Sequence, residues 1–345
     1  MTGREPWPFA PLGVRGRSVD AAVRERLAGS LGALFERLLT IVPHDPEAAA
    51  SLVAAVRTGP VRPAVFAFYT DLVESLSARD ERRARRCLDR LLTMQPASDE
   101  PRIVTLTEAD LGIDAPELYA RLIDDDPTQK MTVAPATDRP SAVDAVTAAL
   151  AMIDRCAPEM GAEICALARE IVAAEPAADP PSGGIRNFDG ATTFYLWGAV
   201  FVNPVQRTTT DLAQTLAHET GHLLLFGMAE GRPLVENPAD ERYGSPLRRD
   251  PRPMEGIVHA AYVIARMHFF LDAALAAGVL PPEGRAAAEA ERARYTEAFF
   301  DALATIDRHA RFTELGDAIF RGAVDYAVDY MTAASAQPPA IAVRA

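Results

Sequence analysis

The amino-acid sequence predicts a mainly α-helical fold with a small β element next to a metal-binding helix. Three observations support this prediction. Apolar residues recur at intervals of three and four over most of the first half, which is the periodicity of amphipathic helices. The run TTFYLWGAVFVN at 192–203 is aromatic and β-branched, as in a strand or a tight hairpin. Soon after it, residues 218–222 read His-Glu-Thr-Gly-His, a spacing that places two histidines on one helical face.

The first half of the chain is expected to consist mostly of helices. Its predicted elements, in order, are a helix over 18–42, two helices within 60–94 that break near 78–80, short strands over 102–106 and 130–136, and helices over 140–154 and 160–174. The stretch EPAADPPSGG at 175–184 is rich in proline, glycine and small residues, so it predicts a linker. We therefore expect a helical N-terminal region at 1–175, a candidate for substrate binding, and a metal-binding catalytic region at 185–345 with covering C-terminal helices.

The composition excludes several classes of protein. A chain of 345 residues that is 49% hydrophobic has enough material for the apolar cores of two ordinary domains or of one large domain. The formal net charge of -13 argues against nucleic acid as a partner, because phosphate binding needs a concentrated basic surface. We expect no membrane partner and a cytoplasmic location, since the sequence shows no signal-peptide pattern and no uninterrupted apolar run of about 18 residues. The three cysteines, Cys87, Cys156 and Cys165, are expected to be free thiols.

The strand-like run at 192–203 leads directly into the metal-binding helix. Pro204 ends the run, and a strand in this place can form one wall of a substrate cleft. Asp211 with Gln214 three residues later resembles a capping box, which predicts that the helix starts at Asp211.

His218 and His222 lie four residues apart, so both imidazoles can be directed at one metal ion. Glu219 lies next to His218, where a zinc peptidase has its general base. The alternative is a pair of surface histidines that bind nothing. The apolar run at 223–226 disfavours it, because that run buries the helix and makes an unpaired histidine pair costly.

A third metal ligand is expected on a second helix. The pattern HExxHxxGxxH fails here, because Leu225 and Met228 replace its glycine and its third histidine. The next suitable residues follow Pro253, which suits the first turn of a helix that continues to about Ala277.

Four polar side chains form one stripe on this second helix. Steps of four, three and four residues join Glu255, His259, Tyr262 and Arg266, so all four share a face. One interpretation is a buried structural network between Glu255 and Arg266. The interpretation that we favour is that the stripe faces the two histidines of the first helix, as in a zincin-like helix pair, and supplies the third ligand. Glu255 and His259 are both candidates for it.

Two segments of the sequence resemble a known family. LAHETGH at 216–222 and SPLRRDPRPMEGIVHAAYVIARM at 245–267 are similar to the HExxH-motif proteins of ribosomal-peptide natural-product (RiPP) gene clusters. The resemblance covers about 182–270. Its most specific part is the pattern RP-x-x-G-x-x-H, carried here by Arg252, Pro253, Gly256 and His259. The sequence departs from the family pattern at Leu247. The family is associated with a tryptophan at this position, directly before the arginine pair.

Members of that family are regarded as iron(II)- and 2-oxoglutarate-dependent peptide β-hydroxylases. The resemblance implies the same activity here, with Fe(II) and 2-oxoglutarate as cofactors and a precursor peptide as the substrate. Such an oxygenase needs three protein ligands on one face of the iron, and the family pattern favours His259 over Glu255 as the third. The distal carboxylate of 2-oxoglutarate needs a cation, for which Arg252 and Arg266 are candidates. Tyr262, on the same stripe, completes the expected cofactor-binding group.

Two other functions stay open at this point. A zinc metallopeptidase would bind zinc in place of iron, with Glu219 as general base and Glu255 as third ligand. In the oxygenase, Glu219 would instead hydrogen-bond a ligand or position the substrate. A catalytically inactive helical scaffold would use the same pocket only to bind a peptide.

Overall fold

The protein is mainly helical, as the sequence predicted. A computed structural model of the chain describes residues 7–39, 41–124, 131–177, 188–245 and 251–332. Helices account for 66% of the described residues and strands for 9%. The family position Leu247 and most of the predicted linker at 175–184 lie outside the described residues.

The chain divides into two compact units. One unit is Leu12–Met228, and the other is Met1–Pro11 with Ala229–Ala345. This division differs from the expected regions at 1–175 and 185–345. The reason is strand pairing across the predicted linker: β3 (Glu170–Pro176) precedes it and pairs with β5 (Ala199–Val202), which follows it. A sheet that uses strands from both sides of a linker holds both sides in one unit.

The unit Leu12–Met228 combines nine helices in its described part with one small sheet. Its helices are α1 (Gly13–Leu38), α2 (Pro46–Thr58), α3 (Pro63–Ser77), α4 (Glu81–Leu92), α5 (Glu108–Leu111), α6 (Ala115–Ile123), α7 (Arg139–Cys156), α8 (Pro158–Leu167) and α9 (Thr209–Ala229). The break between α3 and α4 falls at 78–80, as predicted. Helix α2 was not predicted, although Asp45 caps its first turn by accepting the Glu47 and Ala48 N–H groups.

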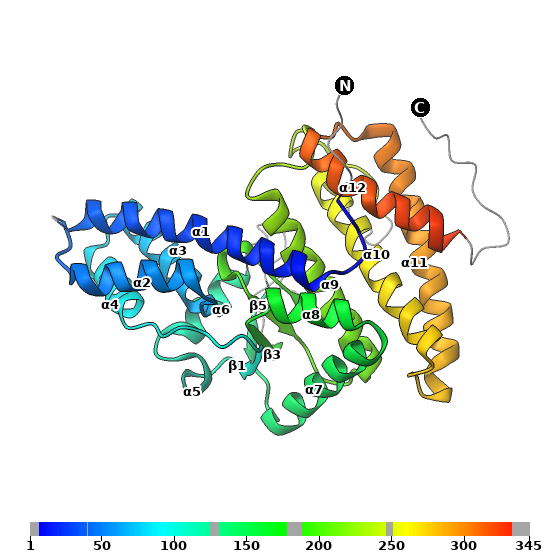
Figure 1. The fold of residues 1–345 in the computed structure, drawn as a ribbon, viewed down its shortest axis with the longest axis horizontal. Helices are drawn as coiled ribbons and strands as arrows, with labels where there is room; N and C mark the ends of the chain where they lie inside the picture. The colour runs from blue at the N-terminus through cyan, green and yellow to red at the C-terminus, as the bar shows by residue number, and fades with distance from the viewer. Residues whose placement is uncertain (1–6, 40, 125–130, 178–187, 246–250, 333–345) are drawn as a thin grey trace. The chain divides into compact units, whose positions relative to one another are not determined.

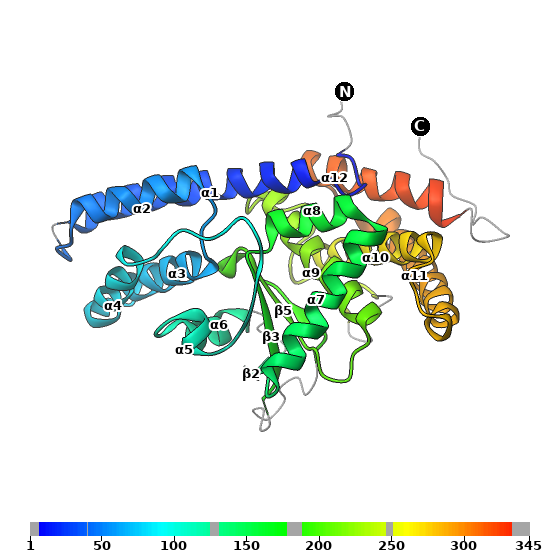
Figure 2. The same cartoon turned by 60° about the horizontal axis from the view of Figure 1, so that its bottom comes forward.

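The sheet is mixed and has the strand order β1-β3-β5-β4, with β2 paired to β3 off that path. Strands β1 (Arg102–Thr105), β3 and β5 are parallel, whereas β2 (Val133–Pro135) and β4 (Gly190–Ala191) run antiparallel to their neighbours. Figure 2 shows α7 lying along this sheet, and α7 contacts β1 and β3. The predicted strand or hairpin at 192–203 is a hairpin in which β4 and β5 flank a short 3-10 turn (Phe194–Leu196).

The central strands are buried because their sequences are apolar on both faces. All four residues of β5, AVFV, are buried, and so are the first five residues of β3. Continuous apolar runs of this kind are typical of parallel strands that are covered on both sides. The position of β5 matters for function, because the chain passes from this rigid strand to α9 over only six residues.

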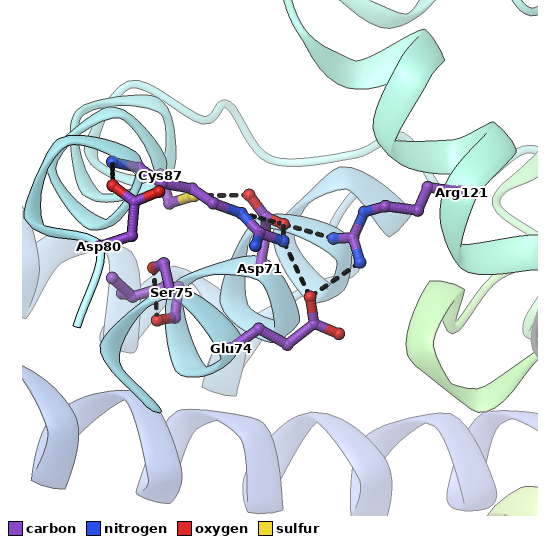
Figure 3. Close-up of polar contacts among 8 residues, drawn as sticks. Asp71, Glu74, Ser75, Asp80, Cys87 and Arg121 are labelled. Atoms are coloured by element: carbon purple, nitrogen blue, oxygen red, sulfur yellow. Dashed lines mark hydrogen bonds and ion pairs between the residues drawn. The ribbon is translucent and has the colours of Figure 1, made fainter. Parts of the chain in front are cut away.

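A polar cluster joins α3, α4 and α6 within the same unit (Figure 3). The buried carboxylate of Asp71 accepts hydrogen bonds from Arg83 and Arg121, and from the Cys87 thiol at 2.9 Å. Glu74 accepts from the same two arginines at 2.9 and 2.7 Å. Burial and the neighbouring Asp71 carboxylate raise the pKa of the Cys87 thiol well above its usual range. Cys87 is therefore an unreactive structural thiol, and all three cysteines are free, as predicted.

The second unit is built on three helices in its described part. They are α10 (Met254–Ala277), α11 (Pro282–His309) and α12 (Glu314–Tyr326), followed by a π-helical turn (Ala327–Met331). Figure 1 shows α10 beside α11 and α12, and α10 contacts both. Pro253 is the N-cap of α10, and Gly278, with φ +63, ends it in the left-handed region that favours glycine.

Helix α10 is long and apolar enough to cross a membrane by length and composition alone. Its 18-residue apolar window has a mean hydropathy of 1.3, and 67% of that window is buried. No second helix of this kind occurs in the described ranges. Burial of this extent is typical of a core helix in a water-soluble protein, and the cytoplasmic location stays a prediction.

Candidate metal centre

Helix α9, which carries the two histidines, starts at Thr209, two residues before the predicted start at Asp211. The hydroxyl of Thr208 accepts the N–H of Asp211 at 3.1 Å, and the carboxylate of Asp211 accepts the N–H of Thr208 at 3.0 Å. This reciprocal pair is a capping box with Thr208 as the cap, so the predicted start at Asp211 with Gln214 was wrong. Threonine competes well for the cap because its hydroxyl can accept from the backbone of the first turn.

His218 and His222 come together on α9 as the spacing predicted. Their Nε2 atoms lie 3.2 Å apart, and their ring planes are inclined by 73°. Two nitrogens that each bind one metal ion at about 2.1 Å lie roughly 3.0–3.4 Å apart for ligand angles between octahedral and tetrahedral. The observed separation lies within this range. The two imidazoles therefore fit iron and zinc equally well.

Glu219 is buried between its own helix and the edge strand β4. Its side chain is 6% exposed, and its Oε1 lies 3.9 Å from the Nε2 of His218. Gly190 of β4 faces it so closely that a Cβ there would lie 2.9 Å from the same Oε1. Burial and the negative charge of Asp189 raise the pKa of Glu219 to about 8. The carboxyl group is thus mostly protonated at neutral pH in the metal-free protein and can donate a hydrogen bond.

The polar stripe on α10 has the predicted composition and is largely buried. The Oε1 of Glu255 lies 3.6 Å from the Nε2 of His259, one turn further along the helix. Tyr262 and Arg266 are 2% and 0% exposed. The ring of Phe9 packs edge-on against Tyr262 with a centroid distance of 5.4 Å. The stripe therefore combines a carboxylate–imidazole contact at its start with a fully buried guanidinium two turns beyond His259.

Glu255 also contacts backbone outside its helix. Its two carboxylate oxygens each accept the Leu234 N–H at 3.2 Å, and one of them accepts the Val235 N–H at 3.3 Å. Burial alone would raise the pKa of Glu255, but the His259 imidazole and these two amides outweigh burial and hold it below its usual range. The carboxylate is therefore ionised at neutral pH.

Arg252 lies just before α10, where its backbone pairs with that of Tyr243 through two hydrogen bonds of 2.9 Å. Its side chain runs past Gly256, since a Cβ at that glycine would meet the Cβ and Cδ of Arg252 at 3.8 Å. A distance of 3.8 Å is an ordinary van der Waals contact, so a side chain at residue 256 would not clash with Arg252. Close packing against Arg252 therefore does not explain the glycine in the RP-x-x-G-x-x-H pattern.

His268, half a helical revolution from His259, takes part in a separate contact. It is fully buried, and its Nδ1 lies 2.8 Å from the hydroxyl of Tyr326 on α12. Burial lowers its pKa to about 4. His268 is therefore a neutral core histidine.

The two halves of the predicted site belong to different units. His218, Glu219 and His222 lie in the unit Leu12–Met228, and the α10 stripe lies in the other. Within neither unit do three His, Cys, Asp or Glu side chains of the described residues form a group that could hold a metal ion. The structure thus pairs His218 with His222, and Glu255 with His259. The third ligand and the cofactor-binding roles of Arg252, Tyr262 and Arg266 stay predictions.

Sequence reasoning missed the groups that surround these pairs. Gly190 and Asp189 fix the environment of Glu219. Gly190 begins a strand of two residues without a strand-like pattern, and Asp189 directly precedes that strand. The Leu234 and Val235 amides are backbone groups that no side-chain motif can report. No family model matches the chain, and no curated protein is detectably similar to it.

Proposed function

We propose that this protein is an iron(II)- and 2-oxoglutarate-dependent oxygenase that hydroxylates a side-chain β-carbon in a peptide natural-product precursor. The observation that carries metal binding is the pair of histidine Nε2 atoms 3.2 Å apart on α9. The resemblance of the 216–222 and 245–267 segments to HExxH-motif peptide hydroxylases supports iron and the keto acid.

In this proposal, α9 and α10 form the zincin-like helix pair expected from the sequence. His218, His222 and one residue of the α10 stripe, His259 or Glu255, would hold the metal. Iron(II) with 2-oxoglutarate and O2 supplies the oxidising power for hydroxylating an unactivated C–H bond.

The buried Arg266 supports 2-oxoglutarate as the cofactor. It lies seven residues after His259, a rise of about 10 Å along the helix. A five-carbon diacid and an arginine side chain together are long enough to span a distance of this order. A guanidinium matches a carboxylate with two parallel hydrogen bonds, and burial strengthens such an ion pair. Arg252, half-buried before α10, is the second candidate for the same carboxylate.

In the metal-free protein, Glu219 has the properties of a hydrogen-bond donor. Its carboxyl group is buried against Gly190, and its raised pKa keeps the proton near neutral pH. A protonated carboxyl can hold a ligand oxygen or orient the peptide, whereas a general base has to be ionised.

The helical N-terminal region offers a place for the peptide. A groove of about 330 Å³ lies between α1 and α2, and its wall is mostly apolar. Its lining includes Phe35, Leu39, Ala50 and Val53. The hairpin of β4 and β5 next to α9 is the second candidate, through addition of an extended peptide strand.

A zinc metallopeptidase is the second candidate function. The position of Glu219 favours it, since the carboxylate lies beside the histidine pair, where a peptidase activates water. Zinc would take the place of iron, with Glu255 as the expected third ligand.

Anaerobic reconstitution with iron(II), followed by 2-oxoglutarate, separates these functions. We expect a visible charge-transfer band at about 500 nm, which reports chelation of the keto acid to iron. The His222→Ala variant is the matched control and should give no band. Absence of the band in the wild type, together with peptide cleavage that zinc restores, would overturn the oxygenase proposal.

A further inference from the structure

The groove between α1 and α2 is large enough to take apolar side chains of a partner. The two helices lie side by side in Figure 1, within the unit Leu12–Met228. The groove has a volume of about 330 Å³, and its middle is lined by Phe35 of α1 and by Ala50 and Val53 of α2. An apolar groove of this size on the surface is a candidate for an interface with another molecule.

Large apolar side chains are exposed at one end of this groove, where the chain turns from α1 to α2. Leu39 and His44 line this end, which we call the turn end. Leu39 is 46% exposed, and Ile41, two residues further along, is 67% exposed. The opposite end is lined by Ala54 and Arg57. The same surface therefore carries both a groove and the kind of side chain that could fill it.

The two ends of the groove carry opposite charges. Glu47 lies in the first turn of α2, at the turn end, and Arg57 lies in its last turn. Ala50 and Ala54 lie between them on the same face, since steps of three, four and three residues separate the four positions. Glu36 of α1 adds a second exposed carboxylate, one turn before Leu39. The face thus has an acidic end, an apolar middle and a basic end.

A face of this kind is complementary to a second copy of itself in the antiparallel direction. A two-fold axis through its middle would place Glu47 opposite the partner's Arg57, and Arg57 opposite the partner's Glu47. It would also bring Leu39 and Ile41 to the basic end of the partner's groove. Arg57 contacts Glu25 at 3.0 Å within its own chain, but both side chains are about half exposed, so an exchange of this ion pair costs little.

We propose that this protein forms a symmetric dimer through the α1–α2 groove, in which Glu47 and Arg57 set the antiparallel alignment and Leu39 and Ile41 fill the groove of the partner. The 13 residues of α2 give this face a length of about 20 Å. An interface of this length is small, so we expect a weak dimer. The inference does not depend on the proposed metal site. It assigns the groove to a second copy and leaves the β4–β5 hairpin to the precursor peptide.

The first test is sedimentation velocity of the full chain between about 1 and 100 μM, the range expected for a small interface. We expect the mean mass to rise with concentration towards twice the mass of the chain. Ile41→Asp should weaken the dimer at least about 10-fold, because it places a charge in an apolar contact. Ile113→Asp is the matched control, since Ile113 is 54% exposed in the same unit, between α5 and α6. A chain that stays monomeric, or equal effects of the two variants, would overturn the proposal, and the groove would again be a candidate for the peptide.

The second test reverses the charges at the two ends. A dimer of Glu47→Arg would bring two arginines together at each end, and a dimer of Arg57→Glu would bring two glutamates together. Each variant alone should therefore dimerise at least about 10-fold more weakly than the wild type. An equimolar mixture of the two variants pairs opposite charges at both ends and should restore the dimer. Circular dichroism checks that each variant is folded. Dimers that form equally well in each variant alone, or a mixture that stays monomeric, would rule out this antiparallel interface.

Discussion

Gly190 and Glu219 are in direct contact, although one lies on the edge strand β4 and the other on helix α9. A Cβ at residue 190 would lie 2.8 Å from the Cγ of Glu219 and 2.6 Å from the Cγ2 of Thr215. The absence of a side chain at Gly190 thus allows the strand to approach the helix and cover the Glu219 carboxyl.

Gly190→Ala is therefore expected to destabilise the protein by about 1–3 kcal/mol, the usual cost of forcing a methyl group into a packed interface. The measurement is urea unfolding followed by circular dichroism. Gly29→Ala is the matched control: nothing lies within 4 Å of a Cβ at that position on α1. Alanine is a better helix former than glycine, so the control should gain about 0.5–1 kcal/mol. Equal stability of the two variants would contradict the close contact.

Glu219→Gln is expected to keep a substantial part of the hydroxylase turnover. Glutamine has the same shape, stays neutral and still donates a hydrogen bond, as the buried carboxyl of Glu219 does near neutral pH. Mass spectrometry of the peptide, with a gain of one oxygen as the readout, measures it. Glutamine cannot serve as a general base, so a zinc peptidase would lose nearly all of its turnover. Complete loss of product with metal binding intact would argue for the peptidase.

Arg266→Lys is expected to weaken 2-oxoglutarate binding by about 10- to 100-fold, because lysine keeps the charge but loses the bidentate match to a carboxylate. Titration of the iron-bound protein with 2-oxoglutarate gives the dissociation constant. Thermal unfolding checks the fold, since Arg266 is fully buried. Arg252→Lys is the paired variant, and a larger effect there would transfer the carboxylate-binding role to Arg252.

His268 is expected to make stability depend on pH between about 4 and 6.5. Burial lowers the pKa of His268 from the usual 6.5 to about 4. The negative charge of Asp272 opposes this shift, and the positive charge of Arg292 adds a smaller lowering effect. The folded protein thus binds fewer protons than the unfolded chain in this range. The contribution of His268 to the free energy of unfolding is complete above pH 6.5. It is lost as the pH falls towards 4, and the total loss is about 3 kcal/mol.

Urea unfolding at several pH values tests this dependence. His268→Gln should reduce the slope of stability against pH in that window, even if its stability at neutral pH is lower. The matched control is His309→Gln, since His309 is exposed. An unchanged slope in His268→Gln would show that burial does not keep the imidazole neutral in the folded protein.

Much of the local structure followed from periodicity. The helices α1, α3, α4, α7 and α10, the break at 78–80 and the strand-like run before α9 have sequence patterns that are strong over many residues. The start of α9 was misplaced by two residues, because two overlapping capping patterns compete and only the packed backbone selects Thr208 as the cap. Helix α2 was overlooked, although Asp45 as N-cap followed by Pro46 is a helix-start signal that the sequence carries.

The expected domain division shows the limit of local patterns. Proline and glycine at 175–184 predicted a boundary, but the β3–β5 pairing depends on residues more than 25 positions apart and holds both sides in one unit. Composition reports chain flexibility, whereas unit boundaries depend on which strands pair.

The sequence by itself determined the pairing of His218 with His222 and the stripe from Glu255 to Arg266, because helical spacing fixes which side chains share a face. Only the tertiary structure decided the surroundings of those groups: the buried, proton-holding environment of Glu219 under Gly190, and the anchoring of Glu255 by the Leu234 and Val235 amides. These features arise from segments that are distant in sequence or contribute only backbone atoms. Side-chain spacing carries no information about either.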